Sequence, residues 1–186
     1  MKKLFEFKTR TIVATGLGAA LFMLLFMYIK IPTGIQETDI KTAYGIGAFF
    51  AALFGPIAGG LIGFIGHALS DAILYGSPWW SWVIASGITC FGVGFVYPKL
   101  RIEEGIFGMS DIIRFNVVQI ISNLVAWVVV APVLDIVIYA EPANLVFLQG
   151  VVAFISNSIS AGVIGTILLV IYSKTKSQKG SLSKEG

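Results

Sequence analysis

Two ionisable residues, His67 and Asp71, stand four positions apart inside an otherwise apolar segment of the chain. That spacing places both side chains on one face of a helix. If the segment crosses a membrane, ionisable groups within it are costly and by default mark a functional site. We therefore predict that His67 and Asp71 bind a polar substrate. The structural alternative is that they pair with each other or cap a turn.

Four aromatic side chains follow directly, grouped around a Gly-Ser-Pro turn: Tyr75, Trp79, Trp80 and Trp82. Flat aromatic walls suit a planar ring ligand, so we predict that these residues contribute to the same substrate site. The alternative is a belt of interfacial aromatic residues, which membrane proteins commonly have at the lipid–water boundary.

Three amide side chains, Asn123, Gln149 and Asn157, lie in the later apolar segments. Counted along a helix, Asn123 and Asn157 fall near the middle of the bilayer and Gln149 lies in its outer half. We expect them to line one outward-facing cavity together with His67 and Asp71. Alternatively, they hold neighbouring helices together by hydrogen bonds.

Several kinds of chemistry have no support in the sequence. The single histidine excludes a multi-histidine metal site within one chain, and the single cysteine, Cys90, excludes an intramolecular disulfide. A phosphate-binding loop, a zinc-protease helix and a nucleophile elbow are all missing from the sequence. We therefore predict no enzymatic activity, no cofactor and no metal, and an energy source outside this chain.

The composition indicates a protein that works in a lipid bilayer. Of the 186 residues 56% are hydrophobic and only 12% are charged, against about 25% charged in soluble domains. A closed β-barrel would show short alternating strands, whereas the apolar runs here are continuous, so we predict an all-α polytopic membrane protein. The net charge of +3 arises mainly at the chain ends and does not indicate nucleic-acid binding.

The apolar runs predict about six transmembrane helices, at residues 11–29, 43–54, 56–74, 79–97, 111–138 and 145–172, with a kink at Pro132. The second of these is short for a bilayer of about 30 Å. The alternative is that residues 43–74 form one kinked helix, which gives five spans. We assign residues 1–172 to a single membrane domain and 173–186 to a polar cytoplasmic tail.

Positive charge decides between five spans and six. Lysine and arginine gather at both ends of the chain, at Lys2, Lys3, Lys8, Arg10, Lys174, Lys176, Lys179 and Lys184. Because positive residues favour the cytoplasmic side, both termini are expected in the cytoplasm, which requires an even number of spans. The connection with Lys99 and Arg101 then also lies inside. We predict a multi-pass protein of a prokaryotic plasma membrane.

Small residues recur four positions apart in the first helix: Ala14 with Gly18, Thr15 with Ala19, and Gly16 with Ala20. Such faces let helix backbones approach closely. They serve either packing within the chain or docking of another membrane subunit.

These features together resemble the substrate-binding S components of energy-coupling factor (ECF) transporters, which import vitamins and related micronutrients. The resemblance covers nearly the whole chain. It rests on the size, the six helices, the stretch ATGLGAA at 14–20 and the run GHALSDAILYGSPWWSW at 66–82. That run is similar to a branch of S components whose members are either left uncharacterised or assigned to hydroxymethylpyrimidine-like ligands.

The resemblance implies a mechanism and partners. The chain would capture a small water-soluble ligand, hydroxymethylpyrimidine- or pyridoxine-like, from outside beneath residues 30–42, with Tyr44 at the pocket border. It would dock through Ala14, Thr15, Gly18 and Ala19 onto a transmembrane T component that is coupled to two cytoplasmic ATPases. Glycine at position 18 replaces one of the alanines usual in this motif.

Two other functions remain open from the residues alone. One is a stand-alone secondary transporter or channel, against which the sequence shows no inverted repeat. The other is an intramembrane enzyme with His67 and Asp71 as acid and base, against which no nucleophile or metal set accompanies them.

Overall fold

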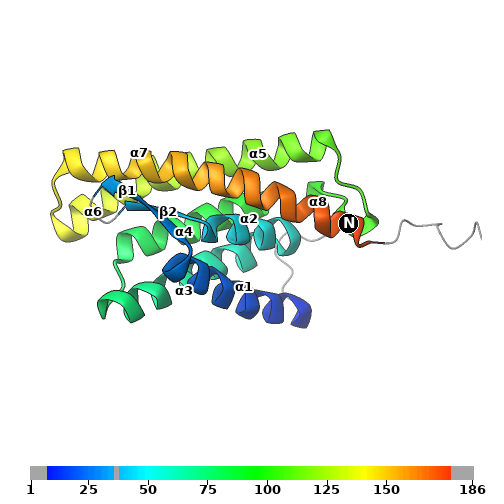
Figure 1. Ribbon diagram of the computed structural model, residues 1–186, viewed down its shortest axis with the longest axis horizontal. Helices are drawn as coiled ribbons and strands as arrows, with labels where there is room; N and C mark the ends of the chain where they lie inside the picture. Colours follow the sequence, from blue (N-terminus) through cyan, green and yellow to red (C-terminus); the bar gives the residue numbers. More distant parts are fainter. Residues whose placement is uncertain (1–7, 36–37, 177–186) are drawn as a thin grey trace, which may run out of the picture.

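The computed structural model describes residues 8–35 and 38–176, which form a helical bundle with one short β-hairpin (Figure 1). The elements in chain order are α1 (Thr9–Tyr28), β1 (Lys30–Ile35), β2 (Thr38–Lys41), α2 (Ala43–Phe54), α3 (Pro56–Tyr75), α4 (Trp80–Val93), two short 3₁₀ turns (Gly94–Lys99 and Ile102–Glu104), α5 (Met109–Leu124), α6 (Ala131–Tyr139), α7 (Ala143–Ser160) and α8 (Thr166–Lys174).

The prediction of an all-α polytopic membrane protein is confirmed. Within residues 8–35 and 38–176, five helical segments are long and apolar enough to cross a bilayer: Thr9–Tyr28, Pro56–Tyr75, Trp80–Lys99, Met109–Tyr139 and Ala143–Lys174. Helix α2 has 12 residues, which extend about 18 Å at 1.5 Å per residue. It is shorter than the hydrocarbon layer of about 30 Å.

Glycine and proline separate α2 from α3, so residues 43–74 do not form one helix. Gly55 has a positive φ of 89°, which ends α2, and Pro56 then occupies the first turn of α3. Proline suits this position because the first helical N–H groups have no partner within the helix. Gly76, with φ of 84°, ends α3 in the same way.

Two segments have local structure that the sequence did not predict. Residues 30–42, expected to lie over the ligand, contain the antiparallel hairpin of β1 and β2. The fourth helix loses α-helical geometry after Val93 and continues as a 3₁₀ turn.

Pro132 follows a π-helical stretch, Val125–Val130, that joins α5 to α6. A wider turn next to proline accommodates the missing helical hydrogen bond, because proline has no N–H to donate.

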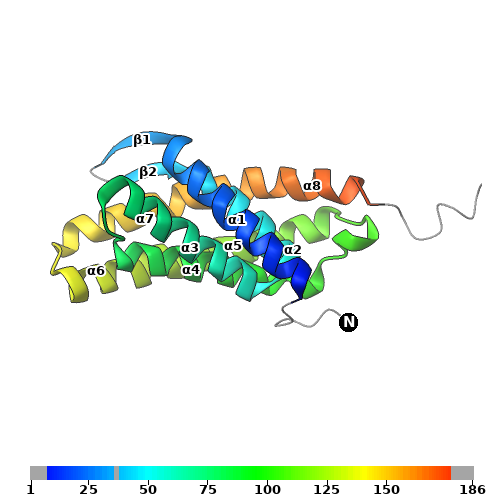
Figure 2. The same cartoon turned by 90° about the horizontal axis from the view of Figure 1, so that it is seen from below.

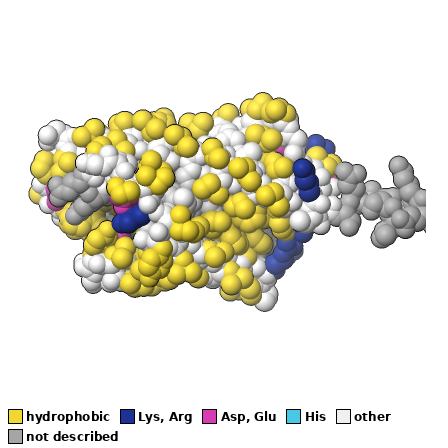
Figure 3. All heavy atoms as spheres, in the orientation of Figure 1, with side chains coloured by type: hydrophobic (Ala, Val, Ile, Leu, Met, Phe, Trp, Pro, Cys, Tyr) yellow, Lys and Arg dark blue, Asp and Glu magenta, His cyan; other side chains and the backbone are white. Residues whose placement is uncertain are grey.

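The molecule has two distinct ends. Helix α1 begins and α8 ends at one of them, whereas the hairpin and the α6–α7 turn lie at the other (Figures 1 and 2). Lysine and arginine gather at the first end, and the face in between is largely hydrophobic (Figure 3). Helix α8 continues to Lys174, two residues into the predicted tail. The lysines at 2, 3, 179 and 184 lie outside the described residues.

The small residues predicted to dock a partner subunit are buried within the chain itself. Ala14, Thr15, Gly18 and Ala19 are all buried. A methyl group added at Gly18 would lie 2.6 Å from Cδ1 of Ile62 in α3 and 3.2 Å from the ring of Phe50 in α2. This face of α1 therefore packs against α2 and α3, as the alternative of packing within the chain predicts.

The opposite face of α1 remains open. A methyl group added at Gly16 would meet no atom within 4 Å, and Ala20 is exposed. Large exposed side chains flank these two residues, namely Ile12, Val13, Leu17, Leu21 and Leu24. The Gly16–Ala20 pair is therefore the small-residue face of α1 that another membrane helix can reach.

Candidate functional site

A cavity of about 370 Å³ lies at the hairpin end of the molecule. Its wall includes His67, Asp71, Tyr75, Trp79, Trp82 and Gln149, all predicted from the sequence, together with Phe26, Ser77, Asp135, Glu141 and Leu145. A smaller cavity of about 80 Å³ adjoins it and is lined by Thr38, Asp39, Lys41, Tyr44, Trp127, Ala153 and Asn157. The two share Phe26, His67 and Trp82. The predicted residues from α2, α3, α4 and α7 thus converge on one place.

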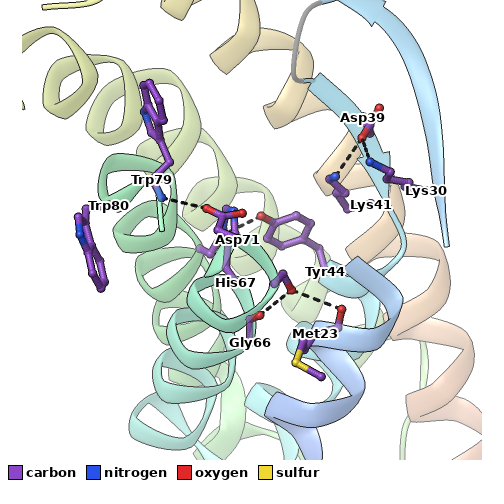
Figure 4. Close-up of polar contacts among 12 residues, drawn as sticks. Met23, Lys30, Asp39, Lys41, Tyr44, Gly66, His67, Asp71, Trp79 and Trp80 are labelled. Atoms are coloured by element: carbon purple, nitrogen blue, oxygen red, sulfur yellow. Dashed lines mark hydrogen bonds and ion pairs between the residues drawn. The ribbon is translucent and has the colours of Figure 1, made fainter. Parts of the chain in front are cut away.

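His67 and Asp71 are buried in α3, at 5% and 4% exposure, and both line the main cavity. Nε2 of His67 lies 3.4 Å from Oδ1 of Asp71, and Oδ2 of Asp71 accepts the backbone N–H of Trp79 at 3.0 Å (Figure 4). Both structural roles considered for the pair therefore occur. Because the two side chains also face the cavity, pairing and ligand contact are compatible.

A hydrogen-bond chain holds the His67 ring from behind. Ser86 Oγ lies 2.6 Å from Nδ1 of His67 and 2.8 Å from the hydroxyl of Tyr44. The ring of Phe26 packs against the imidazole, with 4.2 Å between centroids. One assignment satisfies all of these groups: Tyr44 donates to Ser86, Ser86 donates to Nδ1, and Nε2–H points to Asp71. These contacts fix the orientation of the imidazole at the cavity wall.

Asp135 of α6 organises the aromatic wall. Its carboxylate accepts the indole N–H of Trp79 at 2.6 Å, the indole N–H of Trp82 at 2.8 Å and the hydroxyl of Ser81. Trp82 also stacks on Trp127, with 5.6 Å between ring centroids. Three donors on one buried carboxylate hold both indoles in place and satisfy acceptor sites of its oxygens.

Two predicted site residues lie outside both cavities. Trp80 is 45% exposed, packs on Phe64 and points away from His67 and Asp71 (Figure 4). Asn123 is fully buried and bonds Gln119 and the indole of Trp127. The belt alternative therefore fits Trp80, and the helix-linking alternative fits Asn123. Adjacent positions in a run of tryptophans, 79 and 80, face opposite ways.

The hairpin contributes charged residues at the edge of the smaller cavity. Lys30 and Lys41 each lie 3.0 Å from Oδ2 of Asp39 (Figure 4). Burial alone would raise the pKa of Asp39, but the hydrogen bonds and charges of the two lysines outweigh it and lower that pKa. The ammonium of Lys41 also sits 4.4 Å from the centroid of the Phe26 ring. These contacts hold the hairpin against the cavity.

Sequence reasoning missed several residues of the site, above all Asp135, Glu141, Phe26 and Ser86. Asp135 carried a usable signal, because it is an ionisable residue inside an apolar helix. Phe26 and Ser86 carried none, since phenylalanine and serine are ordinary in membrane helices.

The comparisons with known proteins decide the family. A family model described as "ECF-type riboflavin transporter, S component" matches residues 6–174. The chain belongs to this family. As an ECF-type S component, it is a transport protein and a membrane-embedded substrate-binding subunit of the ECF type.

The relatives of this S component are bacterial. It is 59% identical over 180 residues to a UPF0397 protein of Exiguobacterium sp., covering 97% of this chain and 98% of that one. It is 56% identical to a UPF0397 protein of Clostridium perfringens and 51% identical to one of Lactiplantibacillus plantarum, each over 95% of both chains. No solved structure matches. The protein is a multi-pass component of a prokaryotic plasma membrane.

Proposed function

We propose that this S component captures a small, water-soluble, ring-containing micronutrient from outside the cell and delivers it to the cytoplasm. The observation that carries the proposal is the cavity beneath the hairpin, where buried polar groups and indole rings meet. Pockets that combine apolar walls with a few fixed polar groups are typical ligand sites. The ligand class includes hydroxymethylpyrimidine- and pyridoxine-like compounds.

Delivery requires partners in this proposal. A transmembrane T component would dock on the exposed Gly16–Ala20 face of α1, where a second backbone can approach closely. Two cytoplasmic ATPases, coupled through the T component, would supply the energy. Family membership supports this assembly because S components of ECF transporters typically work with such modules.

The proposed topology has six spans with both termini in the cytoplasm. The basic end of the molecule would face the cytoplasm, in keeping with the preference of lysine and arginine for that side. Helix α2 and the hairpin would together cross the bilayer. The cavity beneath the hairpin would then lie at the outer surface.

Reporter fusions test this topology. Reporters at Lys8 and Arg101 should be cytoplasmic, and a reporter at Gly34 in the hairpin should be external. An external Lys8, or an internal Gly34, would contradict the six-span arrangement.

An intramembrane enzyme is the less favoured function. Ser86, His67 and Asp71 do form a serine–histidine–aspartate contact series. However, Ser86 is fully buried and lines neither of the two cavities. A nucleophile must reach the substrate carbonyl to attack it, so this serine is better suited to orienting His67.

Native mass spectrometry of the purified chain tests ligand capture directly. We expect a small molecule to be retained without any partner subunit, because the cavity is formed by this chain alone. The Trp80→Phe variant serves as a control that should retain it equally, since Trp80 faces away. A protein that binds nothing from cell extract unless partners are present would contradict the proposal.

A further inference from the structure

The main cavity carries an excess of negative charge. Asp71, Asp135 and Glu141 supply three carboxylates to its wall, and among the described residues that line it there is no lysine or arginine. The hairpin contributes Lys30 and Lys41, which both pair with Asp39. The hairpin therefore leaves one positive charge to offset three negative ones.

Excess negative charge at the cavity wall is energetically unfavourable. Carboxylates removed from water are costly unless a cation or strong donors compensate them. Asp135 has three donors, and Asp71 has a backbone N–H and the imidazole. Hydrogen bonds from Trp79, Ser81 and Trp82 satisfy lone pairs of the two carboxylates, but none of these donors carries a positive charge.

The aromatic wall also suits a cation. The rings of Trp79, Trp82, Phe26 and Tyr75 all line the cavity, and indole and phenyl faces attract cations through their electron density. Lys41 already uses the ring of Phe26 in this way from the hairpin side, at 4.4 Å.

An unsatisfied acceptor independently points to a ligand. The side-chain oxygen of Asn157 is buried and has no hydrogen-bond partner among the described residues. Asn157 is 3% exposed and lines the smaller cavity, which shares His67 and Trp82 with the main one. A buried amide oxygen without a donor is costly, so a ligand N–H placed there would complete the site.

We infer that the ligand is a small planar organic cation, with a protonated or quaternary ring nitrogen and an N–H donor. This inference rests on the proposed function. The ring lies between the indoles, the positive charge faces Asp71 and Glu141, and the N–H group reaches Asn157. Asp135 acts as a positioning residue that holds Trp79 and Trp82.

Two isosteric probes test the charge without knowledge of the natural ligand. The 1-methylpyridinium-3-carboxamide cation and neutral 3-methylbenzamide have the same shape and the same amide, and they differ in the charged ring nitrogen. Calorimetric titration of the full chain in nanodiscs should show the cation binding at least tenfold more tightly. A cation that binds no more tightly than the neutral probe, whether both bind or neither does, overturns the inference.

Charge-neutralising variants test which carboxylates cause the preference for the cationic probe. Asp71→Asn and the half-buried Glu141→Gln should each reduce the ratio of cation to neutral affinity several-fold. Glu141→Gln keeps the test valid if Asp71→Asn fails to fold. Glu104→Gln, an exposed change at the opposite end of the molecule, is the matched control and should leave the ratio unchanged. A ratio unaffected by both cavity variants overturns the inference.

The outcome is separable from the proposed function. ATP-dependent transport by the assembled complex, combined with indifference to ligand charge, would overturn only the cation inference. Cation selectivity without such transport would support the inference and overturn the transport proposal.

Discussion

Replacing Asp71 by alanine should weaken binding of the natural ligand by about tenfold or more. The carboxylate is buried, lines the main cavity and is held by His67 and the Trp79 N–H. Leaving a buried polar group without its partner costs about 1–3 kcal/mol, and each 1.4 kcal/mol corresponds to a factor of ten in affinity. His67→Ala should have an effect of similar size, because it leaves both Asp71 and Ser86 short of a partner.

A matched control separates ligand contact from helix capping. Asp111 is also a buried carboxylate that accepts a backbone N–H at a helix start, from Gly108 at 3.2 Å, but it lies outside both cavities. Asp111→Ala should lower the thermal midpoint and leave affinity intact. Titration of the co-purified ligand into each folded variant measures the difference. Unchanged affinity in Asp71→Ala would show that the ligand does not depend on Asp71, and Gln149 and Asn157 would then be the better candidates for its polar contacts.

Gly16→Leu and Gly18→Leu should produce opposite defects, although the two residues lie on the same helix two positions apart. No atom of the described residues lies within 4 Å of a Cβ added at Gly16, so the fold and ligand affinity should be preserved in Gly16→Leu. The leucine would fill the face proposed for the T component and reduce assembly at least tenfold, since close backbone approach is lost.

The Gly18 variant should fail differently. Its Cβ would clash with Ile62 and Phe50, and overpacking of this kind typically costs 1–3 kcal/mol or more. We expect a lower thermal midpoint and loss of ligand binding as well as assembly. Co-purification of the T component, alongside ligand titration, distinguishes the two. Normal assembly of Gly16→Leu would show that the partner docks on another surface.

Sequence patterns predicted the helices and much of the site because each signal was local. A His–Asp pair in an apolar segment indicates a site without any knowledge of its neighbours, and the pair does line the cavity. The break at Gly55 and Pro56 was equally readable from residue type.

Other features depend on tertiary contacts. Asp135 meets Trp79 and Trp82 across more than 50 positions of sequence, so its role as their common acceptor could not be read from spacing. Which of the Gly16 and Gly18 faces of α1 packs within the chain could not be read from the sequence for another reason. A membrane helix is apolar both toward lipid and toward protein, so hydrophobicity does not tell the two sides apart.

The residue composition of the hairpin does not predict β-strands. Pro32 and Gly34 interrupt the first strand, and both residues are unfavourable inside strands. What holds the strands together includes the pairing of Lys30 and Lys41 with Asp39. That contact joins residues on two strands, and it becomes apparent only once the register is known.

Uptake into proteoliposomes tests the central claim most directly. The chain would be reconstituted alone and together with its T component and ATPases, and accumulation of the co-purified ligand would be followed with and without ATP on the ATPase side. We predict that the chain alone binds ligand without accumulating it, and that accumulation requires both the partners and ATP. Accumulation by the chain alone, driven by an ion gradient, or conversion of the ligand to a product, would contradict the account.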